Sequence, residues 1–281
     1  MTARAIKESA CRFGAHRQLA GVLTEPSGDA PRRAFVLVSA GLTPKFGPFR
    51  LYAELARRLA SEGLLALRFD LGGIGDSGQE FANHTLRERT ELEIRAALDH
   101  LTEHYQLDGV ILAGLCSGAE DSFRYAALDP RVSGLMLMDP FGYKTLGWRT
   151  LDMLVRIGRF TLGMLGRLPP AGDGTALIDY KHMDHDEASR ILRSLILRKV
   201  AMHFVYTGGM HESFNHKGQL RAMFEGIDFE GLLALDYFPQ FRHTQALEAD
   251  RRALIDAIAR NLRPHAGREG FASRGAAGCK S

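Results

Sequence analysis

The length, composition and charge of this chain exclude several classes of protein. Its 281 residues are 45% hydrophobic and 25% charged, which is the balance of a globular protein and excludes disorder, collagen and coiled coils. The 36 lysines and arginines only slightly outnumber the 33 aspartates and glutamates, and their interspersed positions form no basic stripe, so we expect a small-molecule partner and no nucleic acid.

Strand and helix signals alternate along most of the chain. Apolar runs bounded by turn residues predict strands on either side of 14–17 within 5–24, and then at 34–39, 64–69, 109–114, 132–138, 201–207 and 232–237. Helical spacing of apolar residues predicts helices at 49–62, 85–105, 118–128, near 219 and at 247–261. Nearly continuous apolar strands between helices are typical of a parallel sheet covered on both faces, so the predicted fold class is α/β and doubly wound.

One stretch interrupts this alternation. Residues 141–199 have helical periods with no strand between them, which predicts a helical cap inserted into a core of residues 1–140 and 200–264. An irregular crossover is the alternative, but it would be unusually long. The aromatic residues and methionines of this stretch could line a pocket, although plain packing explains most of them. Residues 265–281 are small, polar and aperiodic, which predicts a disordered tail.

The chain has no signal for export or for membrane insertion. Its first residues lack an apolar run of signal-peptide length, and no later run reaches the roughly 18 apolar residues of a membrane span. Three scattered cysteines imply no disulfide framework. We therefore expect a cytoplasmic protein without a membrane span, and its oligomeric state stays open.

The sharpest motif is Gly-Leu-Cys-Ser-Gly at 114–118, between an expected buried strand and the helix after it. This pattern matches a nucleophile elbow, in which small residues two before and two after the nucleophile allow a sharp strand-to-helix turn. The register makes Cys116 the nucleophile, because choosing Ser117 would place Leu115 where a small residue is required. The alternative is a buried cysteine in a tight turn.

A nucleophile of this kind needs a base and an acid, in the chain order nucleophile, acid, histidine. His243 follows the last expected strand and precedes the last helix, which is where the fold places its base, although a loop histidine can also be merely solvated. Two residues are candidates for the acid. Glu212 follows the penultimate strand and is favoured, whereas Asp139 ends the strand at 132–138 and is the alternative because it can simply begin a turn before Pro140.

Acyl chemistry also needs donors for the oxyanion. One expected donor is the backbone N–H of Ser117 at the start of a helix, where the free amide and the helix dipole favour negative charge. The second is expected from the loop after 34–39, at Leu42 or Gly41. Together with an imidazolium partner, the helix terminus makes a reactive thiolate at Cys116 plausible.

Two other patterns are weaker candidates for a functional site. The glycines at 73–78 fit a dinucleotide-binding pattern, but no helix with core spacing opens there and no acid follows at the required distance, so a tight turn is favoured. The residues KHMDHDE at 181–187 include metal-ligand types without a recognised spacing, so we expect a solvated face or a helix start. No metal and no cofactor are predicted.

Taken together, these motifs resemble the α/β-hydrolase superfamily, and within it the serine aminopeptidase-like hydrolases related to esterases, lysophospholipases and thioesterases. The resemblance covers about 4–263 and rests on SAGLTPKFGP, LRFDLGGIGDSG, GLCSG and RHT. It departs from the family at Cys116 in place of serine, at Ala40-Gly41 in place of His-Gly and at Arg242 in place of the aspartate often found before the histidine. Relatives with a cysteine nucleophile include dienelactone-type hydrolases and acyltransferases.

Three functions follow from this sequence as hypotheses. The first is a cofactor-free hydrolase of an ester or thioester that forms a covalent acyl-enzyme on Cys116. The second is an acyltransferase that passes the acyl group to an amine or hydroxyl. The third is a non-catalytic binding or scaffold protein on the same fold, because a fold does not guarantee a function.

Overall fold

One eight-stranded sheet organises the chain in the computed structural model, which describes residues 5–28, 30–79, 83–164 and 183–266. The sheet has the order β1-β2-β4-β3-β5-β6-β7-β8, with β1 and β2 antiparallel to their neighbours and the strands from β4 to β8 parallel. The strands are β1 (Ile6–Phe13), β2 (Leu19–Pro26), β3 (Arg33–Val38), β4 (Leu65–Phe69), β5 (Gly109–Leu115), β6 (Val132–Met138), β7 (Ala201–Thr207) and β8 (Leu233–Phe238).

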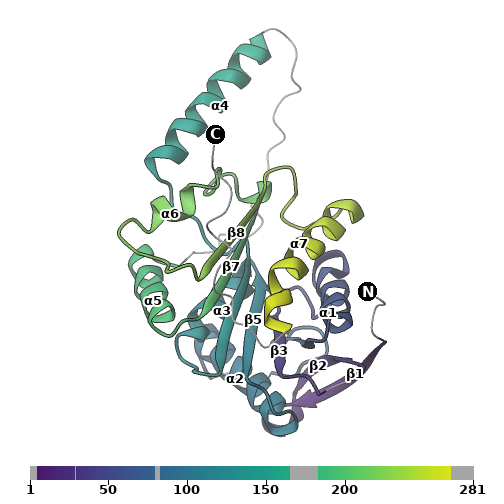
Figure 1. The fold of residues 1–281 in the computed structure, drawn as a ribbon. Helices are drawn as coiled ribbons and strands as arrows, with labels where there is room; N and C mark the ends of the chain where they lie inside the picture. Colours follow the sequence, from purple (N-terminus) through teal and green to yellow (C-terminus); the bar gives the residue numbers. More distant parts are fainter. Residues whose placement is uncertain (1–4, 29, 80–82, 165–182, 267–281) are drawn as a thin grey trace.

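Helices cover both faces of the sheet (Figure 1). The helices are α1 (Leu51–Ser61), α2 (Leu86–His104), α3 (Ser117–Ala126), α4 (Leu146–Met164), α5 (His185–Leu197), α6 (Gln219–Met223) and α7 (Glu248–Ala266). Helices α1 and α7 pack in one hydrophobic core, and α2, α3, α5 and α6 contribute to the other. The predicted α/β, doubly wound fold class is therefore confirmed.

Local sequence signals account for how the long helix α2 begins. Thr85 precedes the helix, and its side chain accepts a hydrogen bond from the backbone N–H of Glu88. The Glu88 carboxylate accepts in turn from the backbone N–H of Thr85, which completes a capping box. On the buried side, Ile94, Leu98 and Leu101 follow helical spacing and are fully buried, so this face packs on the sheet.

The helices between β6 and β7 occupy two different places. Helix α5 buries Leu192 and Leu195 in the same core as α3, so it belongs to the layer that covers the sheet. Helix α4 instead extends away from the sheet (Figure 1). The predicted insertion at 141–199 thus includes one helix of the main core, and its division from that core stays a prediction because 165–182 lie outside the described residues. The predicted tail lies outside them from residue 267 onward.

The parallel strands bring their carboxyl ends to one edge of the sheet. The loop after β3, the turn after β5, the end of β6 and the loop after β8 all meet there. Ligand and catalytic sites of open α/β sheets form at this edge. The candidate residues of the sequence are found on these segments, except Glu212, which follows β7.

Candidate active site

Cys116 lies on a strained turn between β5 and α3. Its φ of 53° and ψ of −121° place a non-glycine residue in a rarely adopted backbone region. The flanking glycines make this turn possible: a Cβ on Gly118 would stand 2.5 Å from the carbonyl oxygen of Val38, and one on Gly114 would collide with Gly118. The Cys116 side chain is half-buried, so its thiol remains partly accessible at the end of β5.

A buried tyrosine supports this turn from α1. The Tyr52 hydroxyl accepts a hydrogen bond from the backbone N–H of Leu115 at 2.8 Å and lies 3.2 Å from the carbonyl oxygen of Val38, to which it donates. The ring is 1% exposed. Tyr52 therefore joins the ends of β3 and β5, next to the turn that carries Cys116.

His243 lies between an acid and the thiol. Its Nδ1 is 2.8 Å from Oδ2 of Asp139, and Cys116 lies close enough to the imidazole to raise its pKa. The histidine comes from the loop after β8 and the aspartate from the end of β6, so three strand ends contribute to the arrangement. It has the connectivity of a nucleophile, base and orienting acid.

Asp139 is held in place from β7. Its side chain is fully buried, and its carboxylate accepts hydrogen bonds from the backbone N–H and the hydroxyl of Thr207, both at 2.7 Å. Its own φ of 46° is unusual for a residue other than glycine. These contacts direct the carboxylate toward His243 and satisfy a charge that would otherwise be costly to bury.

The structure differs from the expected preference for Glu212. This side chain is exposed, and within the described residues it has no recorded hydrogen bond to His243, which is bonded to Asp139 instead. The physical reason is the parallel pairing of β6 with β7, which places the end of β6 beside Thr207 and within reach of the histidine loop. The geometry therefore places Asp139, and not Glu212, against the histidine.

The surroundings of His243 favour its charged form. Burial alone would lower the pKa of the imidazole, but the hydrogen bonds and negative charges of Asp139 and Cys116 outweigh this effect and raise the pKa to about 10. At neutral pH the ring is therefore an imidazolium next to the thiol.

The two expected oxyanion donors from the loop after β3 differ in their availability. The Gly41 backbone N–H donates to Oγ of Ser117 at 2.9 Å, so it is already engaged. The Leu42 N–H has no recorded acceptor in the described part of the chain. Ser117 is the first residue of α3, where a backbone N–H lacks an intrahelical partner. Leu42 and Ser117 thus offer the two free amides.

A buried ion pair holds the same loop against β4. The ammonium of Lys45 contacts carboxylate oxygens of Asp70 and Asp76 at 2.6 Å, and the Lys45 backbone N–H donates to Asp70 at 2.5 Å. The Asp70 carboxylate also accepts from the backbone N–H of Asp76 at 3.0 Å, within the glycine-rich segment 73–78. That segment closes on itself through a hydrogen bond from the Gly73 N–H to the Gly78 carbonyl, as expected of a tight turn.

Several other expected residues have packing roles. Phe141 is fully buried against Phe123 and Phe204, and the Trp148 indole donates to the carbonyl of His211. Asp184, in the predicted KHMDHDE cluster, caps α5 by accepting from the backbone N–H of Asp186. Met153 is exposed, and the side chains at 160 and 164 lie outside those described.

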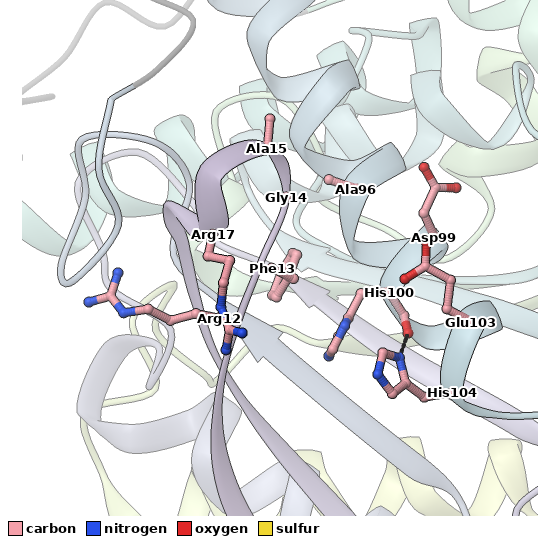
Figure 2. A pocket seen from close by; sticks show the side chains of 10 residues that line it. All are labelled: Arg12, Phe13, Gly14, Ala15, Arg17, Ala96, Asp99, His100, Glu103 and His104. Atoms are coloured by element: carbon pink, nitrogen blue, oxygen red, sulfur yellow. Dashed lines mark hydrogen bonds between the residues drawn. The ribbon is translucent and has the colours of Figure 1, made fainter.

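The structure also contains a surface cavity that is separate from Cys116. Its volume is about 470 Å³, and it lies between the β1–β2 turn and α2. Figure 2 shows the ring of His100 beside Phe13, with Arg17 on the turn side and Glu103 on the helix side. None of the residues grouped around the thiol lines this cavity.

Three supporting residues could not be identified from the sequence. Thr207 ends an apolar strand, and nothing in its spacing indicates a contact with Asp139. Tyr52 follows the helical pattern of α1 like any core residue. Gly209 is needed because a Cβ there would stand 2.5 Å from Cβ of His243. The only available signal is that 208 and 209 are consecutive glycines after a strand.

Comparisons with known proteins bear on the fold. No family model and no curated protein matches the chain. An esterase from Pyrococcus furiosus, Pf2001, is 13% identical with a TM-score of 0.61, over 94% of this chain and 92% of that one. An α/β hydrolase from Penicillium sp. sh18, GrgF, is 15% identical with a TM-score of 0.59, over 93% and 98%. Est1E from Butyrivibrio proteoclasticus is 15% identical with a TM-score of 0.56, over 89% and 96%. The expected α/β-hydrolase fold is confirmed.

Proposed function

We propose that this protein is a cofactor-free acyl hydrolase that cleaves an ester or a thioester through an acyl-enzyme on Cys116. The observation that carries the proposal is that His243 is hydrogen-bonded to Asp139 and interacts with Cys116, whose thiol lies on a strained turn. A thiol, an imidazole and a carboxylate connected in this order are the parts of covalent acyl chemistry.

The first half of the proposed reaction is acylation. The Cys116 thiolate attacks the carbonyl carbon, a new S–C bond forms, and the carbonyl electron pair moves to the oxygen. The N–H groups of Ser117 and Leu42 donate hydrogen bonds to this oxyanion. They lower the activation barrier because fixed donors need little reorganisation as the negative charge develops. The imidazolium of His243 then gives its proton to the leaving oxygen or sulfur as the bond from carbon to that atom breaks.

The second half is deacylation. His243, now neutral, takes a proton from water while the water oxygen attacks the thioester carbonyl. Collapse of the tetrahedral intermediate breaks the S–C bond, releases the carboxylic acid and returns the thiolate beside the imidazolium. Asp139 orients the ring throughout, since hydrogen bonds from Thr207 hold its carboxylate in place.

Intact-mass measurement tests this proposal. Brief exposure to short-chain and long-chain acyl thioesters and aryl esters is expected to add one acyl mass to the wild type and none to Cys116→Ala. The adduct should decay in water with release of the free acid. Faster decay with an added amine or alcohol would instead indicate an acyltransferase. The absence of both an adduct and substrate loss would overturn the catalytic proposal and favour a binding protein.

A further inference from the structure

Large apolar side chains exposed to solvent are concentrated at the edge of the sheet that carries Cys116. Among the described residues, 14 large apolar side chains are exposed, and 11 of them lie in segments that follow the carboxyl ends of β3, β4, β6 and β8. These 11 are Leu42, Phe46, Phe49, Leu86, Leu146, Leu151, Met153, Leu154, Val155, Ile157 and Leu247. Such a one-sided distribution marks an interaction surface, because scattered exposure would place them on all sides.

Helix α4 supplies six of these side chains. Its first turn is fixed to the core: Trp148 is 6% exposed, its indole donates to the carbonyl of His211, and its own carbonyl accepts from the Asn215 side chain. Beyond this turn the helix stands away from the sheet (Figure 1), and Leu154 and Ile157 are 57% and 53% exposed. A firmly anchored helix thus presents apolar side chains outward.

The exposed apolar surface extends around much of the helix. Met153, Leu154 and Val155 are consecutive and all more than half exposed, and consecutive residues of an α-helix point about 100° apart. Together they cover about 200° of the circumference, which is wider than the stripe a helix buries in a protein groove. A lipid surface can receive such a wide apolar face, since a helix lying in the interface sinks into the boundary between headgroups and acyl chains.

The charges of this segment fit an anionic lipid surface. Residues 144–164 contain four basic side chains and one acidic one, a net charge of +3. Two of the basic residues, Arg149 and Arg156, share a narrow polar stripe with Asp152, which is 2.8 Å from Arg156. In the described part of the chain, no helix is long and apolar enough to cross a bilayer. The wide apolar face and the basic side chains of α4 fit a helix that lies on a membrane surface.

We propose that α4, together with the exposed apolar residues of the loop after β3, binds the surface of a bilayer that contains anionic lipid. This contact places the Cys116 edge of the sheet against the membrane, where acyl esters or thioesters of low water solubility are held. Binding itself does not depend on the proposed function. The identification of membrane-held acyl substrates does rest on it.

Vesicle sedimentation of the full chain tests the proposal. We expect the wild type to sediment with phosphatidylcholine vesicles that contain phosphatidylglycerol, and less with phosphatidylcholine alone or at high salt. The double variant Leu154→Glu/Ile157→Glu should weaken this binding by about tenfold or more. The matched control is Leu128→Glu/Leu197→Glu, which changes two exposed side chains at the opposite edge, one in the turn before β6 and one at the end of α5, before β7. This control should bind as the wild type does.

Three results would overturn this inference. The first is that the wild type binds neither kind of vesicle, and the second is that both double variants weaken vesicle binding equally. The third is sedimentation-velocity data showing that α4 instead holds two copies of the chain together. Turnover of a soluble short-chain ester should be unchanged by the α4 variant and abolished by Cys116→Ala, while Cys116→Ala should still bind vesicles. These two readouts distinguish a failure of the membrane-binding proposal from a failure of the proposed catalytic function.

Discussion

The side-chain oxygen of Ser117 accepts a hydrogen bond from the backbone N–H of Gly41 at 2.9 Å, which connects the residue after Cys116 to the loop after β3. These two residues are 76 positions apart in the chain. The contact uses the Gly41 amide and leaves the amide of Leu42 free. One hydroxyl thus holds the loop against the turn that carries Cys116, at the position where we place the oxyanion.

Removing this hydroxyl should reduce the rate of acylation. In Ser117→Ala the Gly41 amide loses its acceptor and the loop loses about 1 kcal/mol of support, so we expect kcat/KM to fall by about fivefold to tenfold. KM should change little, because the hydroxyl is not expected to contact the bound acyl group. The control is Ser122→Ala, which removes a hydrogen bond to the Gly118 carbonyl on the same helix. A larger loss in Ser122→Ala would contradict this interpretation.

Replacing each of the two candidate acids with its amide should show which one supports the activity. Asp139→Asn removes the negative charge beside the imidazole, and we expect kcat to fall by a factor on the order of 100 or more. Glu212→Gln changes an exposed side chain and should leave kcat within about twofold. Steady-state kinetics with an aryl ester compares them, and the reverse order of effects would restore Glu212 as the acid.

The ionisation of His243 can be followed by NMR. With a pKa of about 10, the ring should stay protonated through neutral pH and titrate only in alkali. Because this pKa lies above the ordinary value of 6.5, the stabilisation it provides is complete below about pH 6.5 and is lost as the pH rises toward 10. Cys116→Ala and Asp139→Asn should each lower the titration midpoint. An unchanged midpoint in both would rule out the charge interactions described.

A methyl group at position 209 should displace His243. The added Cβ of Gly209→Ala would lie 2.5 Å from Cβ of His243 and 2.6 Å from its backbone nitrogen, so the loop must move. We expect kcat/KM to fall by a factor on the order of 100, with little change in the midpoint of thermal unfolding. Gly218→Ala is the control, since its new Cβ would meet only the side chain of His216. Full activity of Gly209→Ala would show that the loop is more adaptable than this geometry allows.

The ion pair below the loop should contribute more to stability than a surface pair. Lys45→Met leaves the fully buried carboxylate of Asp70 without its cation, and we expect a loss of about 3 kcal/mol in the free energy of unfolding. Arg32→Met removes an exposed pair with Asp108 and should cost much less, because water and salt screen a pair on the surface. Denaturant unfolding of both variants compares their losses in the free energy of unfolding. Equal losses would show that burial of the ion pair does not determine its contribution to stability.

Local patterns were sufficient to predict most of the elements and the position of the thiol. The strands at 132–138 and 201–207 have the predicted bounds. Their apolar runs are followed by an aspartate and a glycine, respectively, which mark the ends of the strands. The placement of Cys116 on a strained turn follows from glycines two residues away on each side, which is a local requirement of the backbone. His243 was predicted from its place between the last strand and the last helix.

Only the tertiary structure distinguished residues that resemble each other in sequence. Asp139 and Glu212 both follow strands, and the choice depends on a contact across 104 positions and on Thr207 at the end of β7. Gly41 and Leu42 are neighbours, and only the hydroxyl of Ser117 distinguishes their amides. Helix α5 has the same helical period as α4, yet it packs in the core while α4 stands away from the sheet. Periodicity reports the local backbone and the buried face of an element, whereas side-chain direction and long-range pairing depend on how the strands register in the sheet.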